Sequence, residues 1–217
     1  MGLAIGWIAF ETDSKRAVFD ELGLEETENP PEFYPSDFGR FTGVDLGNGW
    51  LAIVFYGGLA NWTEPFEDLS AKRRIVCCDI YERQNLSQAS LWADGKCIWE
   101  IEHFPEKGGQ DYDPEHLEIK GSLPTELASI CERFRIEQKT ADYDHIGDAP
   151  IKVAEQITGF DVTLDRSKWR QMDLIPAEGG PMWLANEQSK KGCRQLIFIT
   201  VAIALALVGI IGWWMFR

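Results

Sequence analysis

The stretch IVCCDIYERQNLSQASLWADGKCIWEIEH, residues 75–103, decides the fold class of this chain. It contains three strand-like segments, Ile75–Tyr81, Gln88–Ala93 and Lys96–His103, and the last two flank the dipeptide Asp94-Gly95. An Asp-Gly pair between alternating apolar segments is typical of a tight β-hairpin, because both residues tolerate the positive φ of its turn. We therefore expect neighbouring antiparallel strands here.

Further strands and helices are expected on both sides of this stretch. Strand patterns cover Leu3–Phe10, Trp50–Tyr56 after the turn pair Asn48-Gly49, and Leu117–Ile119, whereas Glu25–Ser36 is predicted to be a loop. Helix signals are a cap at Ser14 with a stop at Gly23, starts at Thr63-Pro65 and Pro124, and a start at Pro150 with a stop at Gly159. This order predicts a single α+β domain with a mainly antiparallel sheet that helices cover on one face.

Two short segments repeat each other. Gly6-Trp7-Ile8-Ala9 and Gly49-Trp50-Leu51-Ala52 both begin apolar strands, and a short helix is expected after each. Such a pair suggests two βα units side by side, as in ferredoxin-like sheets. The repeat is only four residues long, so coincidence is the alternative.

A weak resemblance covers about three quarters of the chain. Its pieces are short: Gly6-Trp7, Leu22-Gly23-Leu24, Gly49-Trp50, Trp92 to Gly95 with Trp99 and His103, and Pro150 through Ala154 to Phe160. In these pieces the chain resembles a group of uncharacterised bacterial α+β proteins. The resemblance implies an α+β fold and no activity.

The segment Leu196–Phe216 contains no charged residue and no proline. At about 1.5 Å rise per residue it is long enough, as a helix, to cross a hydrocarbon core of roughly 30 Å. The basic residues Lys190, Lys191 and Arg194 precede it, and Trp213 and Trp214 lie at its far end, where interfacial aromatic residues are common. We therefore predict a C-terminal transmembrane helix with these five residues at the two membrane interfaces.

The flanking charges also predict an orientation. Three basic residues precede the segment and only Arg217 follows it, so the positive-inside rule places the N-terminal domain in the cytosol. Leu3–Phe10 has no preceding basic residue and is not expected to be a signal peptide. The expectation is a single-pass, tail-anchored membrane protein.

Charge is distributed unevenly along the chain. The formal net charge is −14, and residues 1–165 contain 32 acidic and 14 basic side chains, whereas residues 166–195 contain six basic and three acidic ones. A strongly acidic domain is repelled by phosphate backbones, so no nucleic-acid partner is expected. We interpret residues 1–165 as the acidic domain, 166–195 as a basic juxtamembrane connector and 196–216 as the membrane span.

Sequence patterns for catalysis, metals or cofactors are weak. Neither G-x-G-x-x-G nor G-x-x-x-x-G-K occurs, and the acidic stretch Asp111–Glu115 lacks the Gly and Glu that a calcium loop requires. Cys77 and Cys78 are expected on opposite faces of one strand, whereas Cys97 and His103 are expected on the same face but about 20 Å apart. No cofactor, metal site or enzymatic activity is predicted.

Tryptophans give the remaining functional signal. Trp62 beside a loop and Trp92 beside the Asp94-Gly95 turn are the two that we expect to face a partner. The leading hypothesis is a non-enzymatic protein-binding module, of the immunity or adaptor type, whose partner has a basic surface. The alternatives are a small-molecule or lipid-sensing domain and an unrecognised hydrolase.

Overall fold

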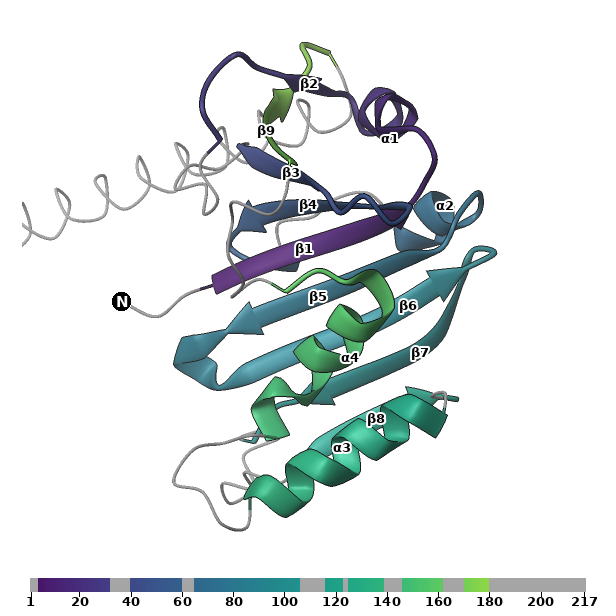
Figure 1. Cartoon of the computed structure of the whole chain (residues 1–217), viewed down its shortest axis with the longest axis vertical. Helices are drawn as coiled ribbons and strands as arrows, with labels where there is room; N and C mark the ends of the chain where they lie inside the picture. Colours follow the sequence, from purple (N-terminus) through teal and green to yellow (C-terminus); the bar gives the residue numbers. More distant parts are fainter. Residues whose placement is uncertain are drawn as a thin grey trace, which may run out of the picture.

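A nine-stranded antiparallel sheet runs through the whole molecule in the computed structural model (Figure 1). The structure describes residues 4–31, 40–59, 65–105, 116–122, 125–138, 146–161 and 170–179, without the side chains of 125–127. The strand order is β2-β9-β3-β4-β1-β5-β6-β7-β8, and every neighbouring pair is antiparallel. The predicted α+β class with an antiparallel sheet is therefore confirmed.

Most elements in the first two thirds of the chain follow the sequence signals, but β2 and β3 were not predicted, and β2 includes Glu25 and Glu26, which were expected in a loop. The strands are β1 Ala4–Glu11, β2 Leu24–Glu26, β3 Phe41–Asp45, β4 Trp50–Tyr56, β5 Ile75–Tyr81, β6 Leu86–Ala93, β7 Lys96–His103, β8 Leu117–Gly121 and β9 Arg170–Pro176. The helices are α1 Lys15–Leu22, α2 Phe66–Ser70, α3 Thr125–Gln138 and α4 Ala149–Thr158. Two 3₁₀ turns, Glu82–Gln84 and Ile146–Asp148, complete the described elements.

Local chemistry explains the helix ends and the hairpins. Ser14 accepts a hydrogen bond from the backbone N–H of Ala17, and Gly23 ends α1 in the left-handed conformation with φ 63°. Both interactions satisfy backbone groups that a helix end leaves without intrahelical partners. Asp94 and Gly95 have φ 50° and 70°, the positive values that a two-residue hairpin turn requires. The predicted cap, stop and turn are confirmed.

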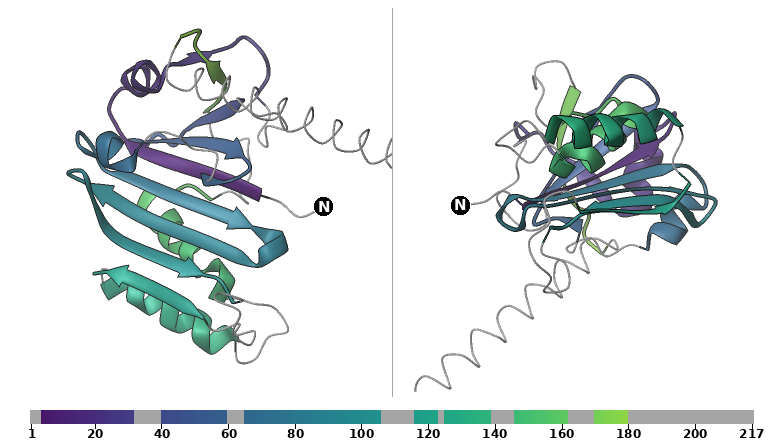
Figure 2. Two further views of the ribbon diagram at one scale, coloured as in Figure 1. Left: turned by 180° about the vertical axis from the view of Figure 1, so that it is seen from behind. Right: turned by 90° about the horizontal axis from the view of Figure 1, so that it is seen from below.

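Helices lie on both faces of the sheet, so the expectation of a single covered face is wrong. Alternate residues of β1 enter two different apolar clusters, Trp7 on the face of α3 and α4 and Ile8 on the face of α1 and α2. The second face is covered only in part. Seen from behind, β5 to β8 have no described helix in front of them (Figure 2, left). Ile75 and Cys77 of β5 are nevertheless buried on this face, whereas Glu100 and Glu102 of β7 and Lys120 of β8 are accessible to solvent there.

The two segments that repeat each other form adjacent strands, but not a ferredoxin-like arrangement. β1 and β4 are neighbours, and α1 and α2 follow them on the same face. The strands are antiparallel, with Trp7 opposite Val54 and Glu11 opposite Trp50. Adjacent βα units of a ferredoxin-like sheet have parallel strands, which require long crossover connections. The hairpin-rich chain forms antiparallel neighbours instead.

The sheet extends into residues that we assigned to the connector from sequence. β9 lies between β2 and β3, and its Met172 and Leu174 are buried in the core. The rest of the predicted connector beyond Gly179 lies outside the described residues, as does Leu196–Phe216. Within the described part of the chain, no helix combines the length and the apolar character needed to cross a membrane.

Candidate functional site

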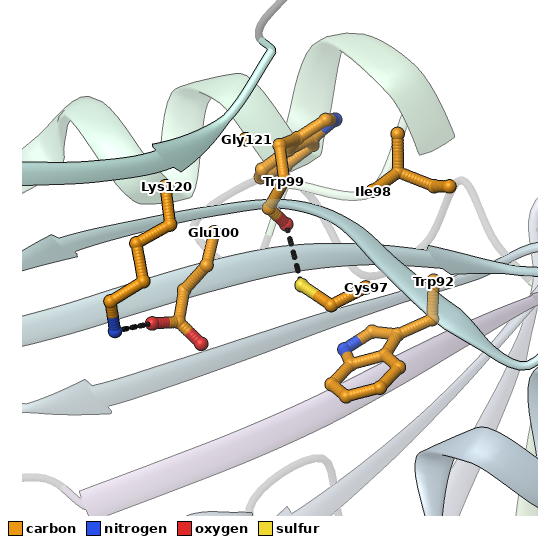
Figure 3. A pocket seen from close by; sticks show the side chains of 7 residues that line it. All are labelled: Trp92, Cys97, Ile98, Trp99, Glu100, Lys120 and Gly121. Atoms are coloured by element: carbon orange, nitrogen blue, oxygen red, sulfur yellow. Dashed lines mark hydrogen bonds and ion pairs between the residues drawn. The ribbon is translucent and has the colours of Figure 1, made fainter.

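A shallow hollow of about 260 Å³ lies on the solvent-exposed face of β6, β7 and β8 (Figure 3). The residues that line it are Trp92, Cys97, Ile98, Trp99, Glu100, Lys120 and Gly121. They come from the end of β6, the first half of β7 and the end of β8. The hollow therefore forms where three neighbouring strands meet the Asp94-Gly95 turn.

A β-bulge in β7 shapes this hollow. Leu91 pairs with Trp99 but Trp92 pairs with Cys97, so one step along β6 corresponds to two steps along β7, and Ile98 is the additional residue. Such a bulge reverses the alternation of side chains. Cys97 accordingly lies on the face of Trp92, whereas Trp99 and Ile101 are buried on the opposite face. The expectation that Cys97 and His103 share a face is therefore wrong.

Trp92, one of the two tryptophans predicted to face a partner, lies at one end of the hollow. Its ring packs against Phe66 of α2 with centroids 5.6 Å apart, and its indole N–H donates a hydrogen bond to Ser90 Oγ at 3.0 Å. The side chain is half-buried. These two contacts fix the ring of Trp92, and part of the side chain is still accessible to solvent.

Carboxylates surround a single lysine at the other end. Lys120 Nζ lies 2.6 Å from Glu100 Oε1 and 3.6 Å from Glu118 Oε1. The hydrogen bond to Glu100 is the main cause of the raised pKa of Lys120, and the charges of Glu118 and Glu102 add to it. Three carboxylates around one ammonium leave an excess of negative charge on this face. We call Glu100, Glu102, Glu118 and Lys120 the acidic cluster.

Cys97 is an exposed residue of the hollow, but it is not an activated nucleophile. Its thiol donates to the Trp99 carbonyl at 3.4 Å. Desolvation and the nearby Glu100 carboxylate raise its pKa, which lowers the fraction of reactive thiolate. Cys77 and Cys78 lie on opposite faces, as predicted, and burial raises the pKa of both thiols. The raised pKa values of all three thiols favour structural roles for Cys77, Cys78 and Cys97.

His103 and Asp79 are buried titratable groups outside the hollow. His103 is fully buried, and its Nδ1 lies 3.0 Å from the Asn85 carbonyl oxygen. Asp79 is 5% exposed and accepts a hydrogen bond from the Leu59 N–H at 3.0 Å, and burial raises its pKa to about 6. Sequence patterns gave no signal for Asp79, because its burial depends on Gly58 packing against it. His103 lies opposite Ser87 in the β6–β7 register, but both residues are buried, and neither His103 nor Asp79 lines the hollow.

Other residues singled out from sequence lie outside the described part of the chain. These are Trp62, Lys190, Lys191, Arg194, Trp213, Trp214 and the acidic stretch Asp111–Glu115. Among the described residues, no group of three or more His, Cys, Asp or Glu side chains is arranged to hold a metal ion. The structure thus brings together Trp92, Cys97 and the acidic cluster.

No protein-family model, no curated protein and no solved structure matches this chain. The features of the chain that bear on function are therefore the geometry of the hollow and the charges around it.

Proposed function

We propose that this chain is a tail-anchored membrane protein whose cytosolic α+β domain is a non-enzymatic protein-binding module of the immunity or adaptor type. The observation that carries the proposal is the exposed face of β6 to β8, where the half-buried Trp92 lies next to the acidic cluster. A rigid aromatic residue is typical of the centre of a protein interface, and charged groups are typical of its rim. The acidic excess calls for a partner with a basic surface.

The size of the hollow favours a protein partner over a small-molecule ligand. Three hollows lined by described residues have volumes of about 220, 260 and 300 Å³. Pockets that enclose drug-sized ligands measure roughly 300–1,000 Å³ and bury most of the ligand. The hollow at Trp92 is at the small end of this range and lies open on a sheet face, so it accommodates one protruding side chain of a partner.

The membrane part of the proposal is supported by Leu196–Phe216 and its basic flank. Asn85, in the sequon Asn85-Leu86-Ser87, provides a test of orientation, because it is an exposed residue of the connection between β5 and β6. Expressed in a eukaryotic host, the full chain should remain unglycosylated at Asn85 if the domain is cytosolic. Glycosylation there, as seen in a mobility shift removed by a glycosidase, would contradict the orientation.

Site-specific cross-linking in membranes of the native host tests the binding face. A photoreactive residue at Cys97, an exposed position on the face of Trp92 (Figure 3), should yield an adduct with a basic protein. The matched control is Ile136, which is 58% exposed on α3 and belongs to the opposite side of the sheet. The Cys97 adduct should decrease with added salt and with Glu102→Gln, because charge complementarity speeds encounter and is screened by ions. Equal adducts from both positions, or adducts that salt and Glu102→Gln leave unchanged, would overturn the proposal.

Trp92→Ala and Trp92→Phe then separate binding from folding. If Trp92 is the central anchor, its truncation to Ala should cost on the order of 2 kcal/mol of affinity for the captured partner. Trp92→Phe keeps a ring against Phe66 and loses the hydrogen bond to Ser90. A partner that binds all three proteins with equal affinity would remove Trp92 from the interface.

A further inference from the structure

The outer strand β8 leaves one of its edges unpaired by any described strand. It ends the strand order of the sheet, and β7 is its only neighbour there. An unpaired edge presents backbone N–H and C=O groups that can pair with another strand. Proteins often protect such edges with proline, with short strands or with charged side chains. Leu117–Gly121 contains no proline, and its two charges, Glu118 and Lys120, have opposite signs, so they can complement the charges of an identical strand.

The charges of β8 alternate with its apolar residues. Glu118 and Lys120 lie on the same face as the Glu100 and Glu102 side chains of β7. Ile119 lies on the other face, opposite the buried Ile101, and is itself 40% exposed. The strand therefore has an acid and a base two positions apart on one face, with an exposed apolar residue between them on the other.

We propose that β8 pairs antiparallel with β8 of a second copy of this chain, with Ile119 opposite Ile119, and so joins two sheets into one across a two-fold axis. In this register Glu118 of each copy lies directly opposite Lys120 of the other. Opposite charges in such cross-strand positions stabilise a sheet, and like charges destabilise it. The two nearest registers that keep the faces aligned place Glu118 opposite Glu118 or Lys120 opposite Lys120. Charge thus selects one register.

The pairing within one copy adds a second argument. Glu102 lies directly opposite Glu118 in the β7–β8 register, which places two carboxylates in neighbouring cross-strand positions. In the proposed dimer, Lys120 of the second copy lies on the other side of Glu118. Within one copy the single Lys120 is shared between Glu100, at 2.6 Å, and Glu118, at 3.6 Å, so the ammonium group of the second copy adds a second positive charge beside Glu118. The same contact occurs twice, because the two-fold axis makes the interface self-complementary.

This inference does not depend on the proposed function, because it concerns an edge of the sheet and not the exposed face. Five residue pairs form a small interface, so the free protein should dimerise weakly. Two copies held in one membrane would have a higher effective concentration, which increases the dimer fraction.

Charge reversal tests the register on the full-length protein in detergent. Glu118→Lys places two lysines opposite each other at both ends of the strand pair, and Lys120→Glu places two glutamates there. Each variant alone should sediment as a monomer under conditions in which the wild type dimerises. A mixture of the two variants should form a heterodimer, because every facing pair is again of opposite charge. A wild type that is monomeric at all concentrations, or variants that self-associate as the wild type does, would overturn the proposal.

Disulfide formation provides a second test that does not require charge reversal. Directly opposite residues have Cα atoms about 4.5–5.5 Å apart, within the range that a disulfide spans. In a background of Cys97→Ser and Cys193→Ser, Ile119→Cys should therefore form a covalent dimer under mild oxidation. The matched control is Ser122→Cys, an exposed position just beyond β8 whose two copies would lie about 20 Å apart. Dimers of equal yield from both positions, or from neither, would contradict the register, and a circular-dichroism melt shows that each variant is folded.

Discussion

The buried carboxyl of Asp79 fixes the turn at Gly58 and Leu59, but it lowers the free energy of unfolding near neutral pH. The carboxyl accepts the Leu59 N–H, and Gly58 is so close that an added Cβ would lie 2.5 Å from Asp79 Oδ1. Burial is the main cause of its raised pKa of about 6, against 3.8 for an exposed group. The folded state therefore binds a proton that the unfolded state releases between these pH values. The contribution of Asp79 to stability is greatest at low pH and decreases as the pH rises from about 4 to 6.

We predict that Asp79→Asn stabilises the protein at pH 7. The amide keeps an acceptor for the Leu59 N–H and has no charge to desolvate, so the gain is on the order of 2–3 kcal/mol, as two pKa units imply. The difference from wild type should disappear near pH 4. Thermal unfolding across this pH range measures the effect, and Asp94→Asn, at an exposed turn position, is the control that should show no such trend. A variant less stable than wild type at pH 7 would mean that the ionised carboxylate is stabilising.

Sequence reasoning at the residue scale succeeded where neighbours in the chain determine the outcome. The cap at Ser14 and the opposite faces of Cys77 and Cys78 follow from local periodicity alone. The position of Cys97 could not be predicted, because the bulge at Ile98 depends on the pairing with β6. Trp92 was identified from its place beside a turn, but its packing against Phe66 joins segments that are far apart in the sequence.

The hairpin elements depend on the same bulge, and Gly121 is the residue that accommodates it. Gly121 has φ 77°, and an added Cβ would lie 2.2 Å from the Ile98 carbonyl oxygen and 3.0 Å from Trp99 Cα. A contact below 3.0 Å with backbone requires the strands to move apart. β8 can therefore pair with the bulged part of β7 only because the residue of β8 at that point, Gly121, has no side chain.

We predict that Gly121→Ala destabilises the protein by more than the roughly 1 kcal/mol that a positive φ alone costs a non-glycine residue. The control is Gly47→Ala, because Gly47 has φ 71° and no heavy atom within 4 Å of an added Cβ. Urea unfolding of the two variants separates the clash from the backbone strain. Equal losses of stability in Gly121→Ala and Gly47→Ala would show that β7 and β8 can move apart at Gly121 without a measurable loss of stability.

Elements with strong alternation were predictable, and short or charged ones were not. The strands Ile75–Tyr81 and Lys96–His103 were predicted with the bounds of β5 and β7. β2 and β3 have only three and five residues, too few for a clear periodicity. β9 was missed because Arg170 and Asp173 lie among its apolar residues and basic residues precede it. Its strand character comes from β2 and β3, which lie on either side of it.

At the scale of the whole molecule, the exposed sheet face could not be anticipated from sequence. Helix signals gave the number of helices but not which face of the sheet each covers. The chain places α3 and α4 over one face. On the other face α2 packs against Trp92, and no other described helix lies in front of β6 to β8 (Figure 2). The candidate site is the consequence, because acidic residues that would be costly under a helix can remain solvated there.

β9 also determines where the folded domain ends. Asp173 is 2% exposed, lies 2.9 Å from Arg40 Nη2 and accepts a hydrogen bond from Thr27, while Met172 and Leu174 fill the core beside it. A chain that ends at residue 165 loses all three side chains and leaves β2 without its only neighbour in the sheet. Burial of two large apolar side chains contributes about 1.5–3 kcal/mol each, so the loss approaches the 5–15 kcal/mol that stabilises a typical domain.

We therefore predict that a chain ending at residue 195 is folded and soluble, whereas one ending at residue 165 is unfolded or melts at a much lower temperature. The first keeps every described strand and removes only the predicted span and Arg217. Thermal unfolding and limited proteolysis of the two chains measure the difference. Asp173→Asn in the longer chain is the intermediate case, because it keeps both apolar side chains but weakens the contact with Arg40. Equal melting temperatures for residues 1–165 and 1–195 would show that β9 is dispensable and that the acidic domain ends before it.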